Sequence, residues 1–271
     1  LLRVPDPTIS DPRQARFMAR GRLKRAGIKI LVGQSILELI SKDSDGTVLL
    51  QNTGPESISE ILEQEGAIPL PPYIHRPDGP NDLDDQRYQT VFAQEPGAAA
   101  APTAGLHFTQ EMLESAARSG IDIAKITLHV GPGTFMPVRV DDIEDHSVLA
   151  EPAFISPDTA ETLNQARRDK RPIIAVGTTV VRTLEGAAYR VGEGEDIEAG
   201  WRQESKVIIP GHKFRMVRGL ITNFHLPKSS LLLLVSAIAG RIELLKAYEE
   251  AVNEGYRFYS YGDAMYLPPS D

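Results

Sequence analysis

The chain has 271 residues, no cysteine and a formal net charge of −8 at pH 7. The lack of cysteine excludes disulfides and thiolate metal ligands. The negative charge argues against nucleic-acid binding by the whole surface, although a local basic patch is compatible with it. The longest apolar run, residues 231–239, is too short for a membrane-spanning helix. We therefore expect a cytoplasmic protein with no membrane partner.

The first part of the chain predicts a small β unit. The sequence opens without Met and without a clear element, so we expect that an N-terminal part is missing. Residues 13–25 carry six basic side chains and no acid, a pattern typical of a solvated segment or of an arm that contacts phosphates. The predicted elements are strands at 28–32, 35–40 and 47–50 and a helix at 57–65.

A proline-stiffened stretch, residues 66–80, is the best candidate for a domain boundary. Pro71 and Pro72 cannot continue a helix or a central strand. The acidic residues 82–85 are expected to form a loop. The sequence leaves open whether Arg87 and Tyr88, which follow, face a ligand.

Strands and helices alternate beyond residue 118, which predicts an α/β fold. Thr109 is the expected N-cap of a helix that precedes this part. The predicted strands cover 121–130, 173–176, 207–209, 220–224 and 256–267, and the predicted helices cover 159–168, 179–189, 229–239 and 242–253.

The segment AAAAPTAGLHFT, residues 98–109, predicts a shaped loop that presents His107 ahead of a helix. Pro102 fixes φ, Gly105 permits a positive φ, and small residues such as Ala104 let the backbone approach a ligand. His107 is a candidate acid, base or donor. A packed surface loop is the competing interpretation.

A turn between a buried strand and a helix, Gly177-Thr178-Thr179, predicts an anion site. The N-terminus of a helix offers unpaired N–H groups and a positive dipole to a carboxylate or phosphate. Capping of the helix by one of the threonines is the alternative. Arg182 either assists with the anion or pairs with Glu185 on the helix face.

A second strand-to-helix transition, residues 221–230, brings Asn223, His225 and Lys228 close together in the sequence. Ligands of open α/β sheets bind at the carboxyl ends of strands, so these residues are candidates for binding. A structural role for His225 is the alternative. His129 precedes a Gly-x-Gly turn that is poor support for a dinucleotide site.

Other polar residues give weaker signals. His107, His129, His146 and His225 together with Glu151 have no helical metal-ligand spacing, so zinc is disfavoured. No Walker loop or Gly-x-Ser-x-Gly elbow is present. Three residues near the end of the chain are compatible either with a ligand site or with capping of a sheet: Arg257, Tyr259 and Asp263.

Seven motifs in order resemble the S-adenosylmethionine:tRNA ribosyltransferase-isomerase family of queuosine biosynthesis. The similarity covers residues 68–267. It implies a larger α/β barrel-like catalytic domain at 68–271 and a smaller β-barrel domain whose remainder is 1–67, with the N-terminal part of the family fold missing. The motifs are PLPPYI, RYQTVFA, AAPTAGLHFT, TLHVGPGTF, AVGTTVVRTLE, LITNFHLPKSSLLLLVSA and YRFYSYGDAM.

The resemblance implies a transfer and isomerisation reaction. The ribosyl moiety of S-adenosylmethionine moves onto 7-aminomethyl-7-deazaguanine at the wobble position of tRNA, which gives epoxyqueuosine and releases adenine and methionine. S-adenosylmethionine is then a consumed substrate, no cofactor or metal is expected, and the family expectation is a monomer.

The implied chemistry starts with loss of a proton beside the sulfonium, which requires a general base. His107, His129 and His225 are the candidates for acid–base catalysis. The expected substrate-binding residues are Arg87, Tyr88, Thr103, Gly105, Gly177, Thr178, Thr179, Arg182, Asn223, Lys228 and Asp263.

The chain departs from the family pattern at two places. Val148 and Leu149 stand where the family has a Met and a second His, and Met136 replaces a basic residue. Two other function classes are retained for comparison. A metal-dependent hydrolase predicts inhibition by chelators, and a noncatalytic tRNA-binding module predicts a basic groove, whereas the catalytic half is not conspicuously basic.

Overall fold

The computed structural model describes residues 2–4, 6, 8–19, 23, 25–44, 46–71, 73–77, 79–131, 148, 150–227 and 229–269. The chain divides into two compact units, Leu1–Tyr88 with Pro96–Ala100, and Gln89–Glu95 with Ala101–Asp271. The functional domains 1–67 and 68–271 stay a prediction. No helix within the described ranges is long and apolar enough to cross a membrane.

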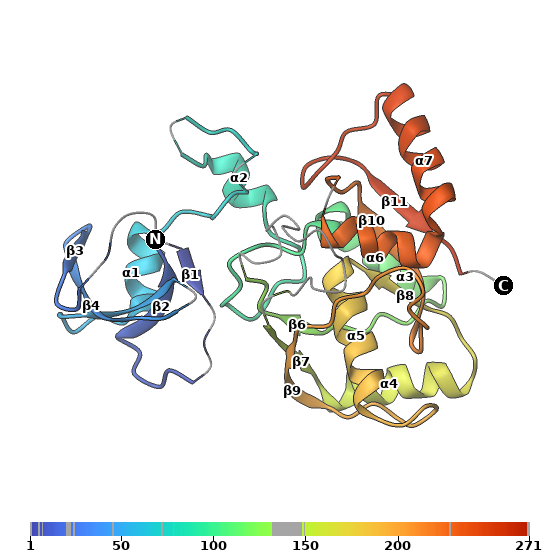
Figure 1. Cartoon of the computed structure of the whole chain (residues 1–271), viewed down its shortest axis with the longest axis horizontal. Coiled ribbons are helices and arrows are strands. Elements are labelled where there is room, and N and C mark those ends of the chain that lie inside the picture. The colour runs from blue at the N-terminus through green and yellow to red at the C-terminus, as the bar shows by residue number, and fades with distance from the viewer. Residues whose placement is uncertain are drawn as a thin grey trace. The chain divides into compact units, whose positions relative to one another are not determined.

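The first unit contains an antiparallel five-stranded sheet with the order β1-β2-β5-β4-β3 (Figure 1). Alternate residues of the strands, among them Phe17, Leu39 and Leu50, form its core with Ile58 and Ile61 of α1. The elements are β1 Leu2–Val4, β2 Gln14–Met18, β3 Lys29–Val32, β4 Ser35–Lys42, β5 Thr47–Asn52, α1 Ile58–Glu65 and α2 Asp82–Arg87.

The basic run that was expected to be solvated contains a core strand, β2. Ala15 and Phe17 are 4% and 1% exposed. Arg16 lies on the opposite face of the strand, where it pairs with Asp6 at 2.7 Å and with Asp43. The expectation is therefore wrong for 14–18, because side chains that alternate along a strand let basic residues share it with core residues.

The acidic stretch at 82–85 forms helix α2, so the expectation of a loop is wrong. Asn81 accepts hydrogen bonds from the backbone N–H groups of Leu83 and Asp84, and the Asp84 carboxylate accepts from the N–H of Asn81. Arg76 pairs with Asp84 at 2.6 Å. Acidic residues in the first turn also complement the helix dipole, which stabilises this short helix.

The second unit contains two three-stranded sheets, β11-β10-β8 and β6-β7-β9, together with most of the helices. Helices α4 and α5 both contact β8, and in Figure 1 α6 and α7 lie beside β10 and β11. The elements are η1 Thr103–His107, α3 Gln110–Arg118, β6 Thr127–Leu128, β7 Glu151–Ile155, α4 Pro157–Arg168, β8 Ile173–Val176, α5 Thr178–Arg190, β9 Gly200–Glu204, β10 Val217–Asn223, α6 Ser230–Ala239, α7 Arg241–Asn253 and β11 Ala264–Leu267.

The mixed α/β class is confirmed, but the barrels are not. The described strands form three open sheets of five, three and three strands. A barrel closes only when its first and last strands pair. Strand β6 has just two residues, and none of the described edge strands pairs to close a sheet.

Most predicted helices are present, and their ends follow local signals. Thr109 caps α3, Ser156 caps α4, and Gly240 at φ 80° separates α6 from α7. The predicted strand at 207–209 is wrong, and those at 121–130 and 256–267 are confirmed only at β6 and β11. Residues 121–126 are irregular, 207–209 form no strand, and only 264–267 of the last segment are a strand.

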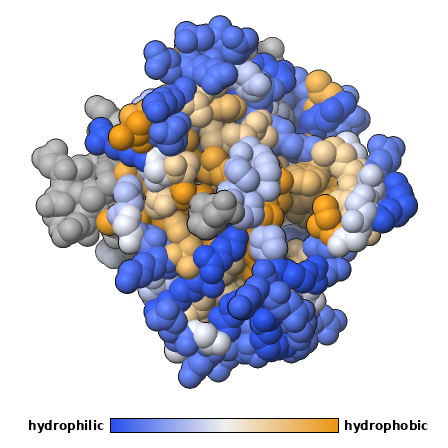
Figure 2. Space-filling view, turned by 90° about the vertical axis from the view of Figure 1, so that its right-hand side faces the viewer, coloured by the Kyte–Doolittle hydropathy of each residue, from blue (hydrophilic) through white to orange (hydrophobic). Residues whose placement is uncertain are grey.

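The core of the second unit lies between its mixed sheet and the helices. Val181 and Leu184 of α5 pack with Leu220 of β10 and Leu234 of α6, and all four are at most 2% exposed. The face drawn in Figure 2 mixes exposed apolar and hydrophilic side chains. Single exposed apolar residues of this kind, such as Ile242 on α7, are ordinary for a folded protein.

Candidate active site

The candidate site lies where two parallel strands end. β8 and β10 pair in parallel, with Val176 opposite Ile221, so that Gly177 and Asn223 follow at the same edge of the sheet. The Gly177 N–H donates to the Ile221 carbonyl at 2.9 Å. A Cβ atom built on Gly177 would lie 3.7 Å from Cβ of Ala104, so η1 reaches this edge as well.

Asn223 is the centre of a hydrogen-bond network that joins three distant segments. Its side chain is buried, at 2% exposed. The amide Nδ2 donates to the Tyr259 carbonyl at 3.0 Å and lies 3.1 Å from His107 Nε2, while the Thr103 hydroxyl donates to Oδ1 at 3.5 Å. The Tyr259 carbonyl can only accept, which fixes the orientation of the amide.

This orientation sets the tautomer of the neutral His107 ring. Because Asn223 Nδ2 can only donate, His107 Nε2 accepts, and the neutral ring carries its proton at Nδ1. Partial burial lowers the pKa of His107, the Asp263 carboxylate opposes this, and Arg257 adds to it. His107 can therefore donate from Nδ1, and it can act as a base at Nε2 when the Asn223 amide moves away.

The turn at 257–263 supplies the third side of the network. Arg257 pairs with Asp263 at 3.0 Å, and its backbone N–H donates to the same carboxylate at 2.7 Å. The hydrogen bonds from Arg257 hold the pKa of the Asp263 carboxyl below its usual range. Tyr259 has a φ of 73°, and a Cβ on Gly262 would collide with the backbone of Arg257 and Phe258. The turn thus accommodates only glycine at position 262.

The alternative that a threonine caps α5 is wrong. Gly177 occupies the N-cap position with a φ of 94°, and no side chain caps the helix, so neither threonine fills this role. Thr178 is buried, at 6% exposed, and Thr179 is partly exposed. The first N–H groups of α5 thus face this edge without a side-chain cap, as an anion site requires.

Gly105 is needed for close packing, and it does not adopt the positive φ that the sequence permits. It is absent from the residues with positive φ, and a Cβ at this position would lie 2.8 Å from both Phe92 and Thr90. A small residue is thus required for η1 to sit close to the segment before it.

His225 contacts a different set of residues from those that His107 contacts. Its Nε2 lies 2.8 Å from the Thr222 hydroxyl, and its backbone N–H donates to the Tyr248 hydroxyl at 2.8 Å. Burial lowers the pKa of His225 to about 4, and burial raises the pKa of Tyr248 to about 12. His225 is therefore neutral near pH 7 and is a weak base.

His129 and Arg182 line a different pocket of the same unit. Arg182 is 7% exposed and binds Glu151 at 3.4 Å, the Lys206 carbonyl at 3.1 Å and the Glu204 carbonyl at 3.4 Å. The alternative that it pairs with Glu185 is wrong. The complete lining is Leu128, His129, Val130, Glu151, Pro152, Ala153, Thr179, Arg182, Thr183 and Glu204.

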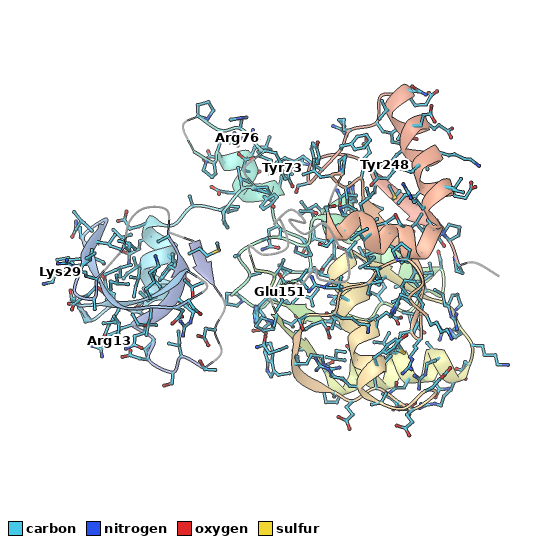
Figure 3. The ribbon with its side chains drawn as sticks, viewed as in Figure 1. Arg13, Lys29, Tyr73, Arg76, Glu151 and Tyr248 are labelled. Atoms are coloured by element: carbon cyan, nitrogen blue, oxygen red, sulfur yellow. The ribbon has the colours of Figure 1, made fainter. Side chains whose placement is uncertain are left out.

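Glu151 on β7, which binds Arg182, and Tyr248 on α7, which contacts His225, lie at separate places in the second unit (Figure 3). The ring of His129 stacks on Trp201 with centroids 5.5 Å apart. The three candidate histidines therefore have three separate sets of partners, and the structure brings only His107 together with Asn223, Thr103 and Asp263.

Of the expected binding residues, two belong to the first unit and one lies outside the described residues. Arg87 is exposed and Tyr88 is buried, at 2% exposed, and both belong to the first unit. Lys228 and Leu149 lie outside the described residues, as do Met136 and His146. Within the part of the chain that is described, no cluster of three or more His, Asp or Glu side chains is suited to a metal ion.

Sequence reasoning considered Glu185 only as a partner of Arg182 and missed the contacts that its carboxylate makes. Its side chain is fully buried and accepts from the N–H groups of Arg215, Met216 and Val217 at 2.9 Å. His212 Nε2 lies 3.2 Å from the same carboxylate. Burial opposes ionisation, but the bonds from His212 and the backbone hold the pKa of Glu185 below its usual range. An acid within the apolar face of a predicted helix was the available signal.

Comparison with known proteins supports the same assignment over most of the chain. Residues 8–267 match a family described as "Queuosine biosynthesis protein". The S-adenosylmethionine:tRNA ribosyltransferase-isomerase of Geobacter sulfurreducens is 50% identical over 244 residues, covering 90% of this chain and 70% of the relative. The enzyme of that name from Desulfitobacterium hafniense is 48% identical over 249 residues, covering 91% and 71%.

A solved structure is also similar. The S-adenosylmethionine tRNA ribosyltransferase of Thermotoga maritima has 29% sequence identity and a TM-score of 0.48, and the match covers 95% of this chain and 71% of that chain. From the match over residues 8–267 and the identity with the curated relatives, the chain belongs to the queuosine biosynthesis protein family, together with S-adenosylmethionine:tRNA ribosyltransferase-isomerases.

Proposed function

We propose that this chain transfers the ribosyl moiety of S-adenosylmethionine to a tRNA and isomerises it. The acceptor is the aminomethyl group of 7-aminomethyl-7-deazaguanine at the wobble position, the product is epoxyqueuosine, and adenine and methionine leave. The observation that carries the proposal is the 50% identity to a named enzyme over 90% of the chain. S-adenosylmethionine is a consumed substrate, no further cofactor is needed, and the enzyme acts as a cytoplasmic monomer.

His107 is the proposed proton-transfer residue. Its lowered pKa keeps the ring neutral near pH 7, and its contact with Asn223 selects one tautomer. A pKa of about 4 makes His225 a poorer base at that pH, because general acid–base catalysis is most effective when the pKa lies near the working pH. His225 and His129 are retained as secondary candidates.

The uncapped N-terminus of α5 is the proposed site for the methionine carboxylate. Gly177, Thr178 and Thr179 begin this helix, and their N–H groups favour an anion. Arg182 already binds Glu151, so its contribution to the carboxylate is indirect, through the helix that it anchors. Thr103, Asn223 and Asp263 are proposed to position the nucleoside.

The test is incubation of the chain with S-adenosylmethionine and a tRNA that carries the aminomethyl-deazaguanine. We expect release of adenine and methionine in equal amounts, together with the mass increase of epoxyqueuosine in the tRNA. Methyl transfer to the tRNA, or adenine release that needs no tRNA, would contradict the proposal. A chelator is the control for the metal-dependent hydrolase, which it would inhibit.

A further inference from the structure

A stretch of the second unit is basic although the whole chain is acidic. Residues 205–242 contain six Lys or Arg side chains and no Asp or Glu, in a chain with a formal net charge of −8. This stretch includes the whole of β10, the strand that ends at Asn223. A local excess of positive charge is the usual sign of a nucleic-acid contact on an acidic protein.

An exposed aromatic ring contacts two cations of this stretch. Tyr189 is 37% exposed. Lys206 Nζ lies 3.8 Å and Arg215 Cζ lies 3.9 Å from the centroid of its ring. The Tyr189 hydroxyl donates to the carbonyl of Lys213, whose side chain is exposed. We call Tyr189, Lys206, Lys213 and Arg215 the Tyr189 cluster.

The cations of the Tyr189 cluster are not neutralised by the protein. Among the described residues, Lys206, Lys213 and Arg215 make no ion pair with a carboxylate. The acid beneath them, Glu185, is fully buried, and its oxygens are occupied by backbone N–H groups and by His212. The positive charge therefore remains available to an anion from outside.

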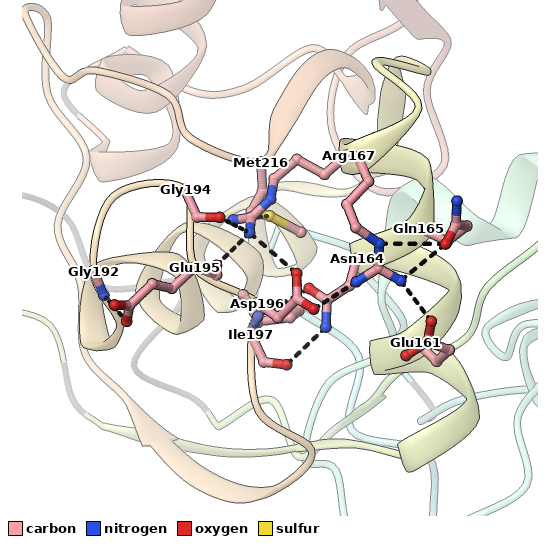
Figure 4. Close-up of polar contacts among 11 residues, drawn as sticks. Glu161, Asn164, Gln165, Arg167, Gly192, Gly194, Glu195, Asp196, Ile197 and Met216 are labelled. Carbon is pink, nitrogen blue, oxygen red and sulfur yellow. Dashed lines mark hydrogen bonds and ion pairs between the residues drawn. The ribbon is translucent and has the colours of Figure 1, made fainter.

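The two arginines at the end of α4 differ from the cations of the Tyr189 cluster because they pair with carboxylates. Figure 4 shows Arg167 bound to the carbonyls of Gly194 and Glu195, beside Asp196. Arg168 pairs with Glu161 at 2.6 Å and with Asp196 at 2.5 Å. The two arginines of α4 thus have carboxylate partners, whereas no ion pair is found for the cations of the Tyr189 cluster among the described residues.

Glu185 anchors the backbone at Arg215, a residue of the Tyr189 cluster. Its carboxylate binds the backbone of Arg215, Met216 and Val217 and so fixes the chain at the point where β10 begins. From Arg215 to Asn223 the chain runs roughly 25 Å at the rise of a β-strand.

We propose that the Tyr189 cluster binds the phosphate backbone of the tRNA substrate, outside the site that takes the wobble base. The inference rests on the proposed function for the identity of the nucleic acid. Phosphate contacts from Lys and Arg position a nucleic acid without reading its sequence, and each one adds to the salt dependence of binding.

The experiment measures binding of fluorescent tRNA to the full chain by anisotropy between 50 and 300 mM KCl. The variants are Lys206→Ala, Lys213→Ala, Arg215→Ala and the triple variant, and Lys125→Ala is the matched control, because Lys125 is an exposed cation outside the cluster. We expect each single variant to raise Kd about threefold and to reduce the salt slope by about 0.7–0.9. The control should match the wild type.

A triple variant with the wild-type Kd and salt slope would overturn the inference, and so would an equal loss in Lys125→Ala. Thermal midpoints and the KM for S-adenosylmethionine separate binding from misfolding, and Lys213→Ala changes only an exposed side chain. Binding of polyglutamate that depends on the cluster, without such dependence for tRNA, would also overturn it. If tRNA binding depends on the cluster but no adenine is released, the proposed reaction fails and the surface stands.

Discussion

The amide of Asn223 donates to Nε2 of His107 across 3.1 Å, although the two residues are 116 positions apart in the chain. Asn223 ends a strand and His107 ends a 3₁₀ helix, and the Tyr259 carbonyl holds the amide in place. The pair selects one neutral tautomer of an imidazole at the edge of a parallel sheet. Its first consequences concern the pH dependence of turnover.

Replacement of Asn223 by Ala should reduce kcat about 10- to 100-fold. The loss of a hydrogen bond to a buried polar group costs about 1–3 kcal/mol, and here it also frees the tautomer of His107. Asn223→Asp is the informative second variant, because its carboxylate favours a protonated His107 and should move the acidic limb of the pH–rate profile to higher pH. Wild-type kcat and an unchanged profile in both variants would remove the pair from the mechanism.

Asp263→Asn should move the acidic limb to lower pH. The Asp263 carboxylate raises the pKa of His107, so its neutralisation favours the neutral ring over a wider range. Arg257→Met should have the opposite effect, because Arg257 lowers the same pKa. The measurement is the rate of adenine release from pH 5 to 8. Shifts in the same direction, or none, would show that His107 does not set this limb.

The stability of the wild type should fall as the pH falls from 6.5 towards 4. His225 has a pKa of about 4 in the folded chain, while a free imidazole titrates near 6.5, so the unfolded chain binds an extra proton between these values. This corresponds to about 3 kcal/mol over the full window. Urea unfolding at pH 7 and pH 5 should show a smaller loss for His225→Gln, and an equal loss would contradict the assignment.

Glu185→Gln should lower the free energy of unfolding by about 2–4 kcal/mol. The variant keeps one acceptor oxygen but turns an amide group towards N–H donors of Arg215, Met216 or Val217. Glu161→Gln is the control, because Glu161 makes only an exposed pair with Arg168, and such pairs contribute little. Similar denaturation midpoints for both variants would argue against a structural role for Glu185.

Periodicity and capping signals identified most of the second unit. The buried run at 173–176 is β8 as predicted, and the N-cap predicted at Thr109 marks the start of α3. These features are local, because a cap depends on a few neighbouring residues. The apolar alternation at 121–126 did not give a strand: Ile121 and Ile123 are 58% and 42% exposed, and no strand within the described ranges pairs with them.

Several residues of the candidate site could be predicted from the sequence, but their association in space could not. His107, Asn223 and Asp263 were candidates on chemical grounds, and the resemblance placed them in one family. Their association depends on β8 and β10 pairing in parallel and on the turn at 257–263, which are long-range features. For the same reason the pairing of Arg182 with Glu151, a residue of another sheet, could not be predicted from local spacing.

Arg182 joins parts of the second unit that otherwise belong to different sheets. It projects from α5, which packs on β8 and β10, and it binds Glu151 of β7 and the carbonyl of Glu204 at the end of β9. Separation of the two sheets would leave a guanidinium without partners inside the protein, and an uncompensated buried charge is strongly destabilising. The two sheets are thereby thermodynamically coupled, and local opening of one spreads to the other as a single cooperative event.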